Sequence, residues 1–293
     1  MKKKLLFTAC MLLLFTAFVG NSIPVQASTE YKVIGTNPNY QTVKERTVGK
    51  TAFVFTESYA GGSGVNYLYA IKHGKRTLLA SGTGLQSSII TNGSTVYYFY
   101  RKNNPSYITS IVYKIPSIGK KGRRLFSVKD CTPITFCGYY NEKIYYTSGE
   151  LDKEKFCSYN INSRKKKKIE DKDAAGARQC GQYFYLTPPD GDVGPILFRV
   201  YNAKTGKIKT ISKSMLGNNI ISNFVYYIES KSSGITNGIN KREYFDIAVK
   251  KCRLNGSNKK TLVKDLRITG VKKIRKNSIT YYDVNGKEKT KRF

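Results

Sequence analysis

The sequence is poor in the residues from which catalytic sites are built. Its 293 residues include 19 Asp and Glu, a single histidine (His73) and no tryptophan. Any Ser-His-Asp or Cys-His arrangement would depend on His73 alone, which stands in a predicted turn. No two adjacent segments offer a clear carboxylate pair for sugar hydrolysis, although carboxylates distant in sequence could meet in the fold. We therefore assign no catalytic residues.

Metal ligands are scarce as well. No CxxC motif occurs, and one histidine cannot complete a zinc site with cysteines. The stretch Asp190-Gly191-Asp192, which follows two prolines, could contact Ca²⁺, but a turn is the simpler interpretation. We expect no metal and no cofactor.

Long apolar runs are missing after the N-terminus. Lys2, Lys3 and Lys4 precede a mostly apolar run over residues 5–19, which is followed by Pro24 and the small-residue pattern ending at Ala27. This is the order of a secretory signal, and the run is shorter than the roughly 20 residues that span a bilayer. We predict that residues 1–27 are a signal peptide, with an uncleaved N-terminal anchor as the alternative. The mature chain would have no transmembrane span and would be secreted or associated with the cell envelope.

Five cysteines follow residue 27: Cys131, Cys137, Cys157, Cys180 and Cys252. An odd number cannot all pair within one chain, and a domain of this size does not need disulfides. We favour buried thiols, with one disulfide, for instance between Cys137 and Cys180, as the alternative.

Positive charge is what the chain has in excess. It holds 51 Lys and Arg, and the formal net charge is +32 at pH 7. Cleavage after Ala27 removes three lysines and no acidic residue, which leaves +29. Such a charge attracts polyanions over long distances and is screened by salt.

Six short aromatic segments repeat along the chain with a mean spacing of about 45 residues. They are Phe53-Val54-Phe55, Val96-Tyr97-Tyr98, Ile144-Tyr145-Tyr146, Tyr183-Phe184-Tyr185, Val225-Tyr226-Tyr227 and Thr280-Tyr281-Tyr282. Most are followed by an alternating strand, a basic or glycine turn such as His73-Gly74, and another apolar strand. No sustained apolar stripe with a 3.6-residue period occurs, so helices should be few.

Four short strands in every 45 residues or so are typical of a β-propeller blade. We predict an all-β fold, a single six-bladed propeller of four-stranded antiparallel blades over residues 28–293. The blades are expected near 41–83, 84–130, 131–173, 174–214, 215–265 and 266–293. The last has room for three strands, and an N-terminal strand at 31–34 would complete it and close the ring. Five or seven blades, or another β solenoid or sandwich, are the alternatives.

The repeat resembles a known family. A paired-tyrosine strand is followed by a strand of the type Leu-Tyr-x-Ile and a Gly-Lys turn, as in Val96-Tyr97-Tyr98 with Ile111-Val112-Tyr113-Lys114-Ile115, Ile144-Tyr145-Tyr146 with Ser158-Tyr159-Asn160-Ile161, and Val225-Tyr226-Tyr227 with Arg253-Leu254-Asn255-Gly256. This resembles the secreted bacterial propellers grouped as DUF5050, which are similar to the low-density-lipoprotein-receptor-related propeller. The resemblance covers residues 41–293. It departs from the family in its lysine-rich turns, where Asp-Gly is expected, and in its lack of tryptophan. It implies a fold and a location but no activity.

The basic turns are candidate binding residues. They hold the cations Lys75, Arg76, Lys120, Lys121, Arg123, Arg124, Arg164, Lys165, Lys166, Lys167, Lys168, Lys207, Lys209, Lys259 and Lys260. If each turn joins the third and fourth strands of a blade, all lie on one face and give it a strongly positive potential. The alternative is a solubilising surface. The tyrosine pairs could stack on sugars or bases, but we interpret them as core residues because they recur in every blade.

The longest loop, residues 229–243, is a candidate site for a protein partner, through Lys231, Asn237, Asn240, Lys241 and Arg242. Drift in loop length is the alternative. The sequence thus predicts a monomeric, non-enzymatic binding module that engages an anionic envelope polymer or a protein. An extracellular nucleic-acid binder, or a secreted hydrolase or lyase using carboxylates or tyrosines, are the other possibilities.

Overall fold

The computed structural model describes residues 30–34, 44–60, 63–150, 153–170, 176–187, 196–231, 235–236 and 243–293. The regular structure of these residues consists of strands alone, which confirms the predicted all-β class. No helix in the described part is long and apolar enough to cross a membrane. The predicted signal peptide lies outside the described residues.

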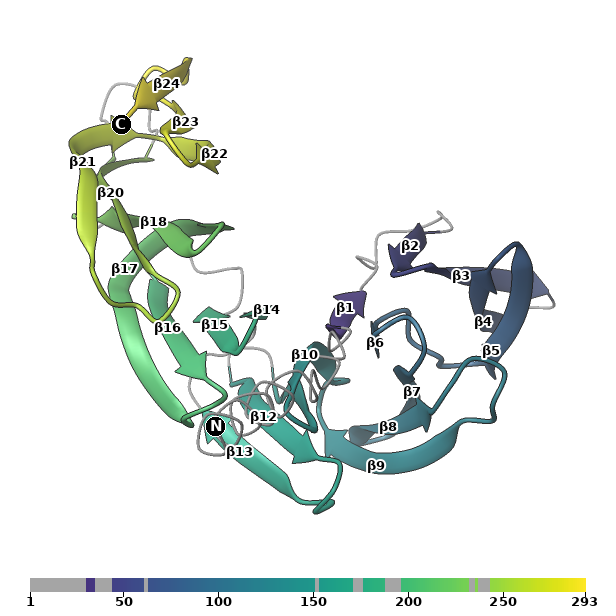
Figure 1. Ribbon diagram of the computed structural model, residues 1–293. Coiled ribbons are helices and arrows are strands. Elements are labelled where there is room, and N and C mark those ends of the chain that lie inside the picture. Colours follow the sequence, from purple (N-terminus) through teal and green to yellow (C-terminus); the bar gives the residue numbers. More distant parts are fainter. Residues whose placement is uncertain are drawn as a thin grey trace, which may run out of the picture. The chain divides into compact units, whose positions relative to one another are not determined.

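The strands form antiparallel sheets in chain order (Figure 1). The first sheet contains β2 (Lys44–Val48), β3 (Thr51–Ala60), β4 (Ser63–Lys72) and β5 (Lys75–Gly82). The second contains β1 (Lys32–Ile34), β6 (Ile89–Thr91), β7 (Val96–Asn104), β8 (Tyr107–Ile115) and β9 (Arg123–Asp130). The third contains β10 (Thr135–Tyr140), β11 (Lys143–Ser148), β12 (Lys155–Asn160) and β13 (Lys166–Glu170).

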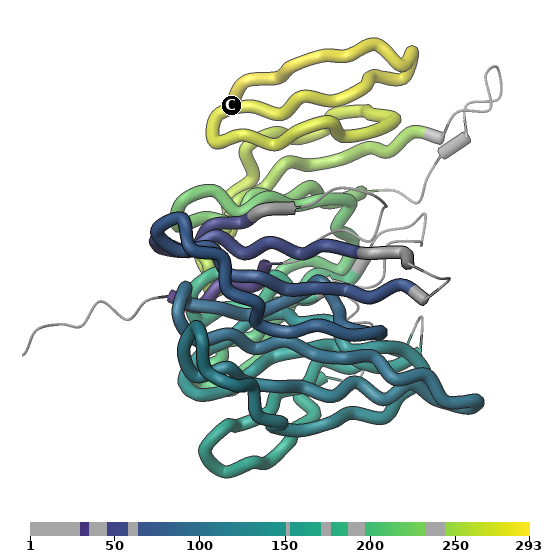
Figure 2. Tube along the Cα trace, turned by 90° about the vertical axis from the view of Figure 1, so that its right-hand side faces the viewer, coloured from purple at the N-terminus to yellow at the C-terminus, as the bar shows by residue number. Residues whose placement is uncertain are grey.

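The next sheet has eight strands because two meanders share one strand. It contains β14 (Gly176–Cys180), β15 (Tyr183–Thr187), β16 (Ile196–Asn202), β17 (Lys207–Ile221), β18 (Phe224–Ser230), β19 (Ile235–Thr236), β20 (Glu243–Arg253) and β21 (Lys260–Ile268). The first part of β17 pairs with β16 and its last part with β18, the two parts meeting at Met215. The last sheet contains β22 (Gly270–Arg275), β23 (Ser278–Tyr282) and β24 (Glu288–Arg292). Figure 2 views these strands from the side.

The N-terminal strand does not complete the last sheet, so that prediction is wrong. In β1, Lys32, Val33 and Ile34 pair with Thr91, Ile90 and Ile89 of β6. The reason is side-chain packing: Ile34 belongs to the core between the first and second sheets, while Tyr31 and Val33 pack in the core between the second and third. The last sheet keeps three described strands, and its edge strand β24 is fully exposed and mostly charged, which disfavours further strand pairing.

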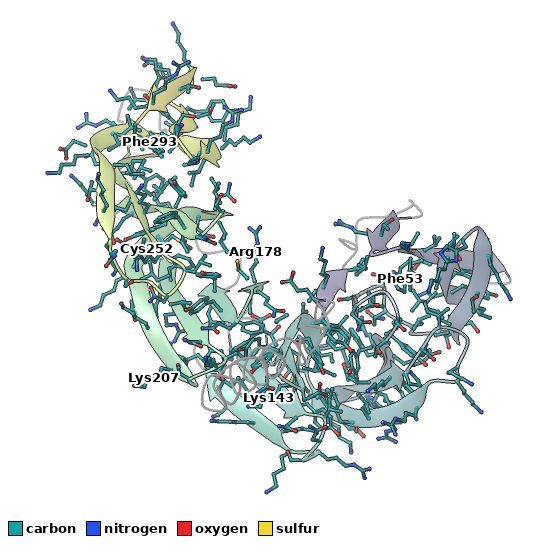
Figure 3. The ribbon with its side chains drawn as sticks, viewed as in Figure 1. Phe53, Lys143, Arg178, Lys207, Cys252 and Phe293 are labelled. Atoms are coloured by element: carbon teal, nitrogen blue, oxygen red, sulfur yellow. The ribbon has the colours of Figure 1, made fainter. Side chains whose placement is uncertain are left out.

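The core lies between neighbouring sheets, where side chains fill the space (Figure 3). Most of the tyrosine pairs are buried there, as predicted, but Tyr282 of the last pair is 36% exposed. Successive residues of a strand point to opposite faces, so Tyr97 packs toward the third sheet and Tyr98 toward the first. Tyr145 and Tyr146 divide in the same way between the sheets on either side of their own.

The aromatic segments are not all in one register. Tyr98, Tyr146 and Tyr227 each pack against the preceding meander, but Tyr185 packs against the following one. In that meander Phe184 is the residue that packs against the preceding sheet, where its ring centroid lies 4.3 Å from that of Tyr145. A shift of one residue along a strand reverses every side chain, so aligning the segments by their last residue is wrong at this repeat.

The five described cysteines are free thiols, so the alternative disulfide between Cys137 and Cys180 is not formed. Cys137, Cys157 and Cys252 are buried, as favoured, and burial raises the pKa of Cys252 to about 11. Cys131 differs from the prediction because it is exposed, with its Sγ 3.6 Å from Glu150 Oε1.

Candidate polyanion-binding hairpins

The predicted basic residues lie at the hairpins that join the third and fourth strands of each meander. Lys75 and Arg76 begin β5, directly after the turn that ends β4. In the other hairpins the cations lie in the turn or in the first residues of the fourth strand. They are Lys120, Lys121, Arg123 and Arg124 before and at the start of β9, Arg164 to Lys168 before and at the start of β13, Lys207 and Lys209 at the start of β17, and Lys259 and Lys260 before and at the start of β21. In an antiparallel meander this hairpin lies at the same end as the turn between the first and second strands.

Hydrogen bonds between sheets join these ends. Near the turns between first and second strands, Thr51 Oγ1 donates to Gly93 O at 2.8 Å, and Asn219 Nδ2 donates to Ile274 O at 3.0 Å. These bonds connect the first sheet to the second and β17 to the last sheet. They bring corresponding ends of neighbouring sheets together.

Two of the basic hairpins also reach the adjacent meander. Lys166 Nζ donates to Ser127 O of β9, and Lys259 Nζ donates to Ile211 O of β17, each at 2.5 Å. In these two pairs, the neighbouring basic hairpins lie close enough for their potentials to add. We call the hairpins, with the cations they carry, the basic end.

The turns are held by local side-chain bonds. Asn160, Asn202 and Asn255 end or follow the third strand of three successive meanders, and the Oδ1 of each accepts a backbone N–H two residues on at 3.0 Å. Such Asx turns fix the backbone without help from distant residues. In the first sheet the turn uses His73 and Gly74 with φ of 49° and 75°, which agrees with the predicted tight turn. The asparagine that recurs at this turn is visible in the sequence and marks the third-to-fourth-strand hairpin in three meanders.

The cations of the basic end are exposed and lack nearby acids. All of the predicted basic side chains are exposed. Apart from Lys168, none forms an ion pair with a carboxylate among the described residues. Among the described residues of 31–293, the topology places one acidic side chain at this end, Glu142 in the turn between β10 and β11. The positive potential is therefore not neutralised locally.

Acidic residues gather toward the opposite end of the strands. Asp130 and Glu170 end the outer strands β9 and β13, and Glu150 and Glu154 lie between β11 and β12. Several of these and other acids are paired: Glu170 with Arg199, Glu150 with Lys153, Asp246 with Arg267, and Asp265 with Lys231. The two ends therefore differ in how many described acidic side chains accompany their cations: the basic end has few, and the opposite end has most of them.

A second repeated feature was not visible in the sequence. The ladder between the third and fourth strands carries a β-bulge in each meander that has both strands. The extra residue is always aliphatic: Leu79, Leu125, Ile169, Ile211 and Leu262. A bulge bends and twists the outer strand. Because only strand pairing reveals a bulge, the sequence alone could not locate it.

The candidate partner loop is described only in part. Lys231 forms an ion pair with Asp265, whose pKa this pairing lowers, and so it is not a free cation for a partner. Asn237, Asn240, Lys241 and Arg242 lie outside the described residues, as does the candidate Ca²⁺ contact Asp190-Gly191-Asp192. The described part of the chain contains no group of three or more His, Cys, Asp and Glu that could hold a metal ion.

One network of a serine, a glutamate and a lysine has the residue types of a catalytic site, but its serine hydroxyl is buried. Ser212 Oγ donates to Glu229 Oε1 at 2.8 Å, and Lys250 forms an ion pair with the other oxygen of Glu229. Ser212 is buried, which keeps its hydroxyl from a substrate. The three residues come from neighbouring strands β17, β18 and β20, so the network ties the sheet together.

Comparisons with known proteins find solved structures of similar fold but no matching family. No family model matches the chain, and no curated protein matches it. Among solved structures it is similar to a putative TolB from Agrobacterium tumefaciens, at 15% identity and a TM-score of 0.44, over 76% of this chain and 80% of that one. It is also similar to the β-propeller domain of the Trilobed protease from Pyrococcus furiosus, at 9% identity and a TM-score of 0.46, over 84% and 91% of the two chains.

Proposed function

We propose that this chain is an exported, six-bladed β-propeller of the DUF5050 type that binds an anionic polymer of the cell envelope through its basic end. The blades would be the first three sheets, the second of which carries β1 as a fifth strand, the two meanders that share β17, and the last sheet. The protein acts as a binding module, without catalysis. The observation that carries the proposal is the set of exposed hairpin cations, which recur at one strand position and, apart from Lys168, form no ion pair with a described carboxylate.

The attraction between the basic end and a polyanion is electrostatic. Exposed cations separated by less than the Debye length of roughly 8 Å at physiological salt act together on a polyanion. Lys166 and Lys259 each bond to the preceding meander, which brings two pairs of neighbouring hairpins into contact. A purely solubilising surface would mix both signs of charge, whereas here the described acids lie mostly toward the opposite end of the strands and leave the hairpin cations without them.

The test is retention of the mature protein on purified cell walls and on DNA over a salt series. We expect retention on cell walls that falls steeply as salt rises. Retention that does not change with salt would contradict the basic end as the binding surface. Stronger retention on DNA than on cell walls at every salt concentration would replace the envelope polymer with nucleic acid.

A further inference from the structure

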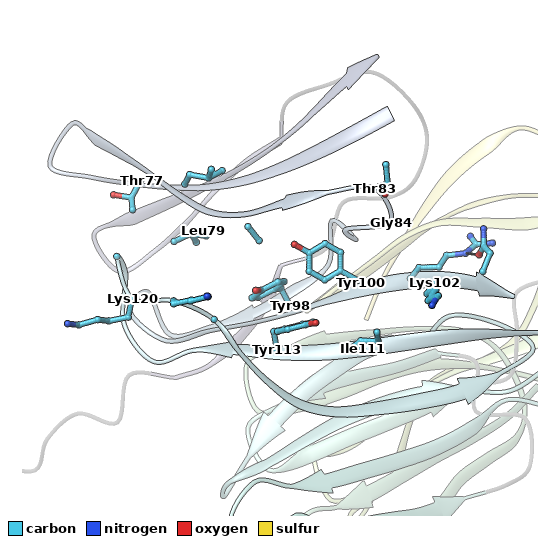
Figure 4. A pocket seen from close by; sticks show the side chains of 17 residues that line it. Thr77, Leu79, Thr83, Gly84, Tyr98, Tyr100, Lys102, Ile111, Tyr113 and Lys120 are labelled. Carbon is cyan, nitrogen blue, oxygen red and sulfur yellow. Dashed lines mark hydrogen bonds between the residues drawn. The ribbon is translucent and has the colours of Figure 1, made fainter. Parts of the chain in front are cut away.

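An open groove separates the first and second sheets on the outer side. It has a volume of about 1090 Å³ and is bounded by β5 on one side and by β7, β8 and the β8–β9 loop on the other (Figure 4). Residues 77–80 form one wall, and Tyr98, Tyr100 and Tyr113 form the floor. The volume is in the range of pockets that hold small organic ligands.

Leu78 in this wall breaks the pattern of the other repeats. The shared bulge aligns the outer strands residue by residue, and it places Leu78 at the position of Arg124, Lys168, Thr210 and Thr261. The other four are polar or charged, while Leu78 is apolar and 51% exposed. A single exposed leucine is common on protein surfaces. An exposed leucine that lines a groove, at a position where the other repeats have polar residues, indicates a binding surface more strongly.

Ala80 explains why the groove is open. The same alignment places Ala80 where the second sheet has Phe126. Phe126 stacks on Tyr159 of the third sheet with ring centroids 4.1 Å apart, and Tyr159 OH donates to Leu125 O at 3.3 Å. The ring centroid of Phe126 also lies 5.6 Å from that of Tyr146. Tyr98 holds the place of Tyr146 one repeat earlier, but it faces a sheet with Ala80 in place of an aromatic ring. The small side chain leaves the space that Phe126 fills between the next two sheets.

The floor is aromatic and the two ends of the groove are basic. Tyr98 and Tyr113 stack with centroids 5.4 Å apart, and Tyr100 meets both edge-on at 5.8 and 5.6 Å. Lys120 and Lys121 line the end near the basic hairpins, and Arg101 and Lys102 line the other. No Asp or Glu is among the described lining residues. The groove therefore combines apolar faces with positive charge at both ends.

We propose that this groove binds an acidic glycan, a chain of sugar rings that carries carboxylate or phosphate groups. The C–H faces of a sugar ring pack on Tyr100 and on the aliphatic wall of Leu78 and Leu79, while the anionic groups reach the lysines and arginines at the ends. The inference rests on the proposed function and assigns the basic end a specific subsite.

The arrangement of the rings favours a sugar over a nucleobase. Nucleic-acid sites offer separate aromatic faces on which successive bases stack. Here Tyr98 and Tyr113 already stack on each other, and the opposite wall is aliphatic. A single continuous surface of rings and methyl groups fits the puckered face of a sugar better than the flat face of a base.

The test is calorimetric titration of the full-length protein with a hexagalacturonate, a neutral cellohexaose and an oligothymidylate at one salt concentration. Leu78→Thr takes the residue found at the same position in two other repeats, so it should fold, and it leaves the charge unchanged. Phe224→Thr is its matched control, because Phe224 is 36% exposed and lies outside the groove. K120A/K121A removes two charges inside the groove, and K165A/K167A removes two outside it.

We expect Leu78→Thr to weaken hexagalacturonate binding about 5-fold, equivalent to roughly 1 kcal/mol, with Phe224→Thr unchanged. K120A/K121A should weaken binding more than K165A/K167A. If Leu78→Thr binds like the parent and both lysine pairs have equal effects, the groove subsite is wrong while the basic end stands. If no anionic ligand binds at all, the proposed function fails as well. Equal binding of cellohexaose, or tighter oligothymidylate binding that Leu78→Thr weakens, would overturn the acidic glycan.

Discussion

The side-chain amide of Gln179 brackets the backbone of Tyr139 in the neighbouring sheet. Its Oε1 accepts the N–H of Tyr139 at 2.9 Å, and its Nε2 donates to the carbonyl of Tyr139 at 2.8 Å. Gly138 makes the approach possible, because a Cβ there would meet the Gln179 amide and come within 2.8 Å of the Phe184 ring. One amide thus replaces two backbone partners between β10 and β14.

Gln179→Ala should destabilise the protein by about 1–3 kcal/mol, because it leaves the Tyr139 N–H and carbonyl without partners. Gln182→Ala is the matched control, since no side-chain hydrogen bond of this neighbouring glutamine is described in the structure. Thermal unfolding followed by circular dichroism measures both variants. Equal unfolding midpoints for the two variants would show that the two hydrogen bonds of Gln179 with Tyr139 add nothing to stability.

The ion pair between Arg199 and Glu170 should matter more than those at the surface. Arg199 Nη1 lies 2.6 Å from Glu170 Oε2, and the two side chains are 8% and 15% exposed. Removing one partner of a buried pair leaves an uncompensated charge, so Glu170→Ala should cost about 3–5 kcal/mol. Lys272→Ala breaks an exposed pair with Glu288 and should cost less than about 1 kcal/mol. Urea unfolding of both variants gives the comparison, and similar losses would contradict the burial argument.

Stability should fall at high pH through the buried tyrosines. Burial raises the pKa of Tyr98 to about 12, and it also raises the pKa values of Tyr97, Tyr145 and Tyr227. An unfolded tyrosine ionises near pH 10, so the unfolded state releases protons that the folded state keeps. The stabilisation is complete below about pH 10 and is lost as the pH rises above it. Absorbance at 295 nm should show a late ionisation step that coincides with loss of the β signal. Smooth ionisation of all tyrosines in a folded protein would contradict it.

Glu229 should give an opposite dependence at low pH. Burial raises its pKa, but hydrogen bonds from Lys250 and Ser212 outweigh that effect and hold the pKa below its ordinary value. The carboxylate therefore contributes stability above its unfolded pKa of about 4.3, and the contribution is lost as the pH falls through the folded value. Glu229→Gln should lower the urea midpoint at pH 7 and bring it close to that of the parent protein in acid. A constant difference between the two proteins at all pH values would count against this assignment.

The sequence was sufficient for the strands and turns because both depend on local chemistry. Alternating apolar residues predicted β7 and β8, and glycine turns such as His73-Gly74 adopt the positive φ expected of them. The basic residues could be assigned to hairpins for the same reason. What local chemistry could not decide was the partner of each strand.

Three features therefore escaped the sequence. The strand β1 pairs with β6 because Ile34 and Tyr31 fit two different cores, which no pattern within residues 31–34 reveals. The packing of Phe184, rather than Tyr185, against the third sheet depends on a one-residue shift in register. The groove depends on Ala80 and Leu78, which look ordinary until the bulge aligns them with Phe126 and Arg124.

The most direct test of the account is the salt dependence of binding to a soluble acidic polymer, measured for the parent protein and two matched variants. K165A/K167A removes two cations of the basic end, and K129A/K155A removes two exposed cations from the opposite end of the strands. We expect the slope of log affinity against log salt to become shallower by about one for each contacting cation removed in K165A/K167A, and to stay unchanged in K129A/K155A. Equal slopes for all three proteins would contradict the claim that the hairpin cations form the binding surface.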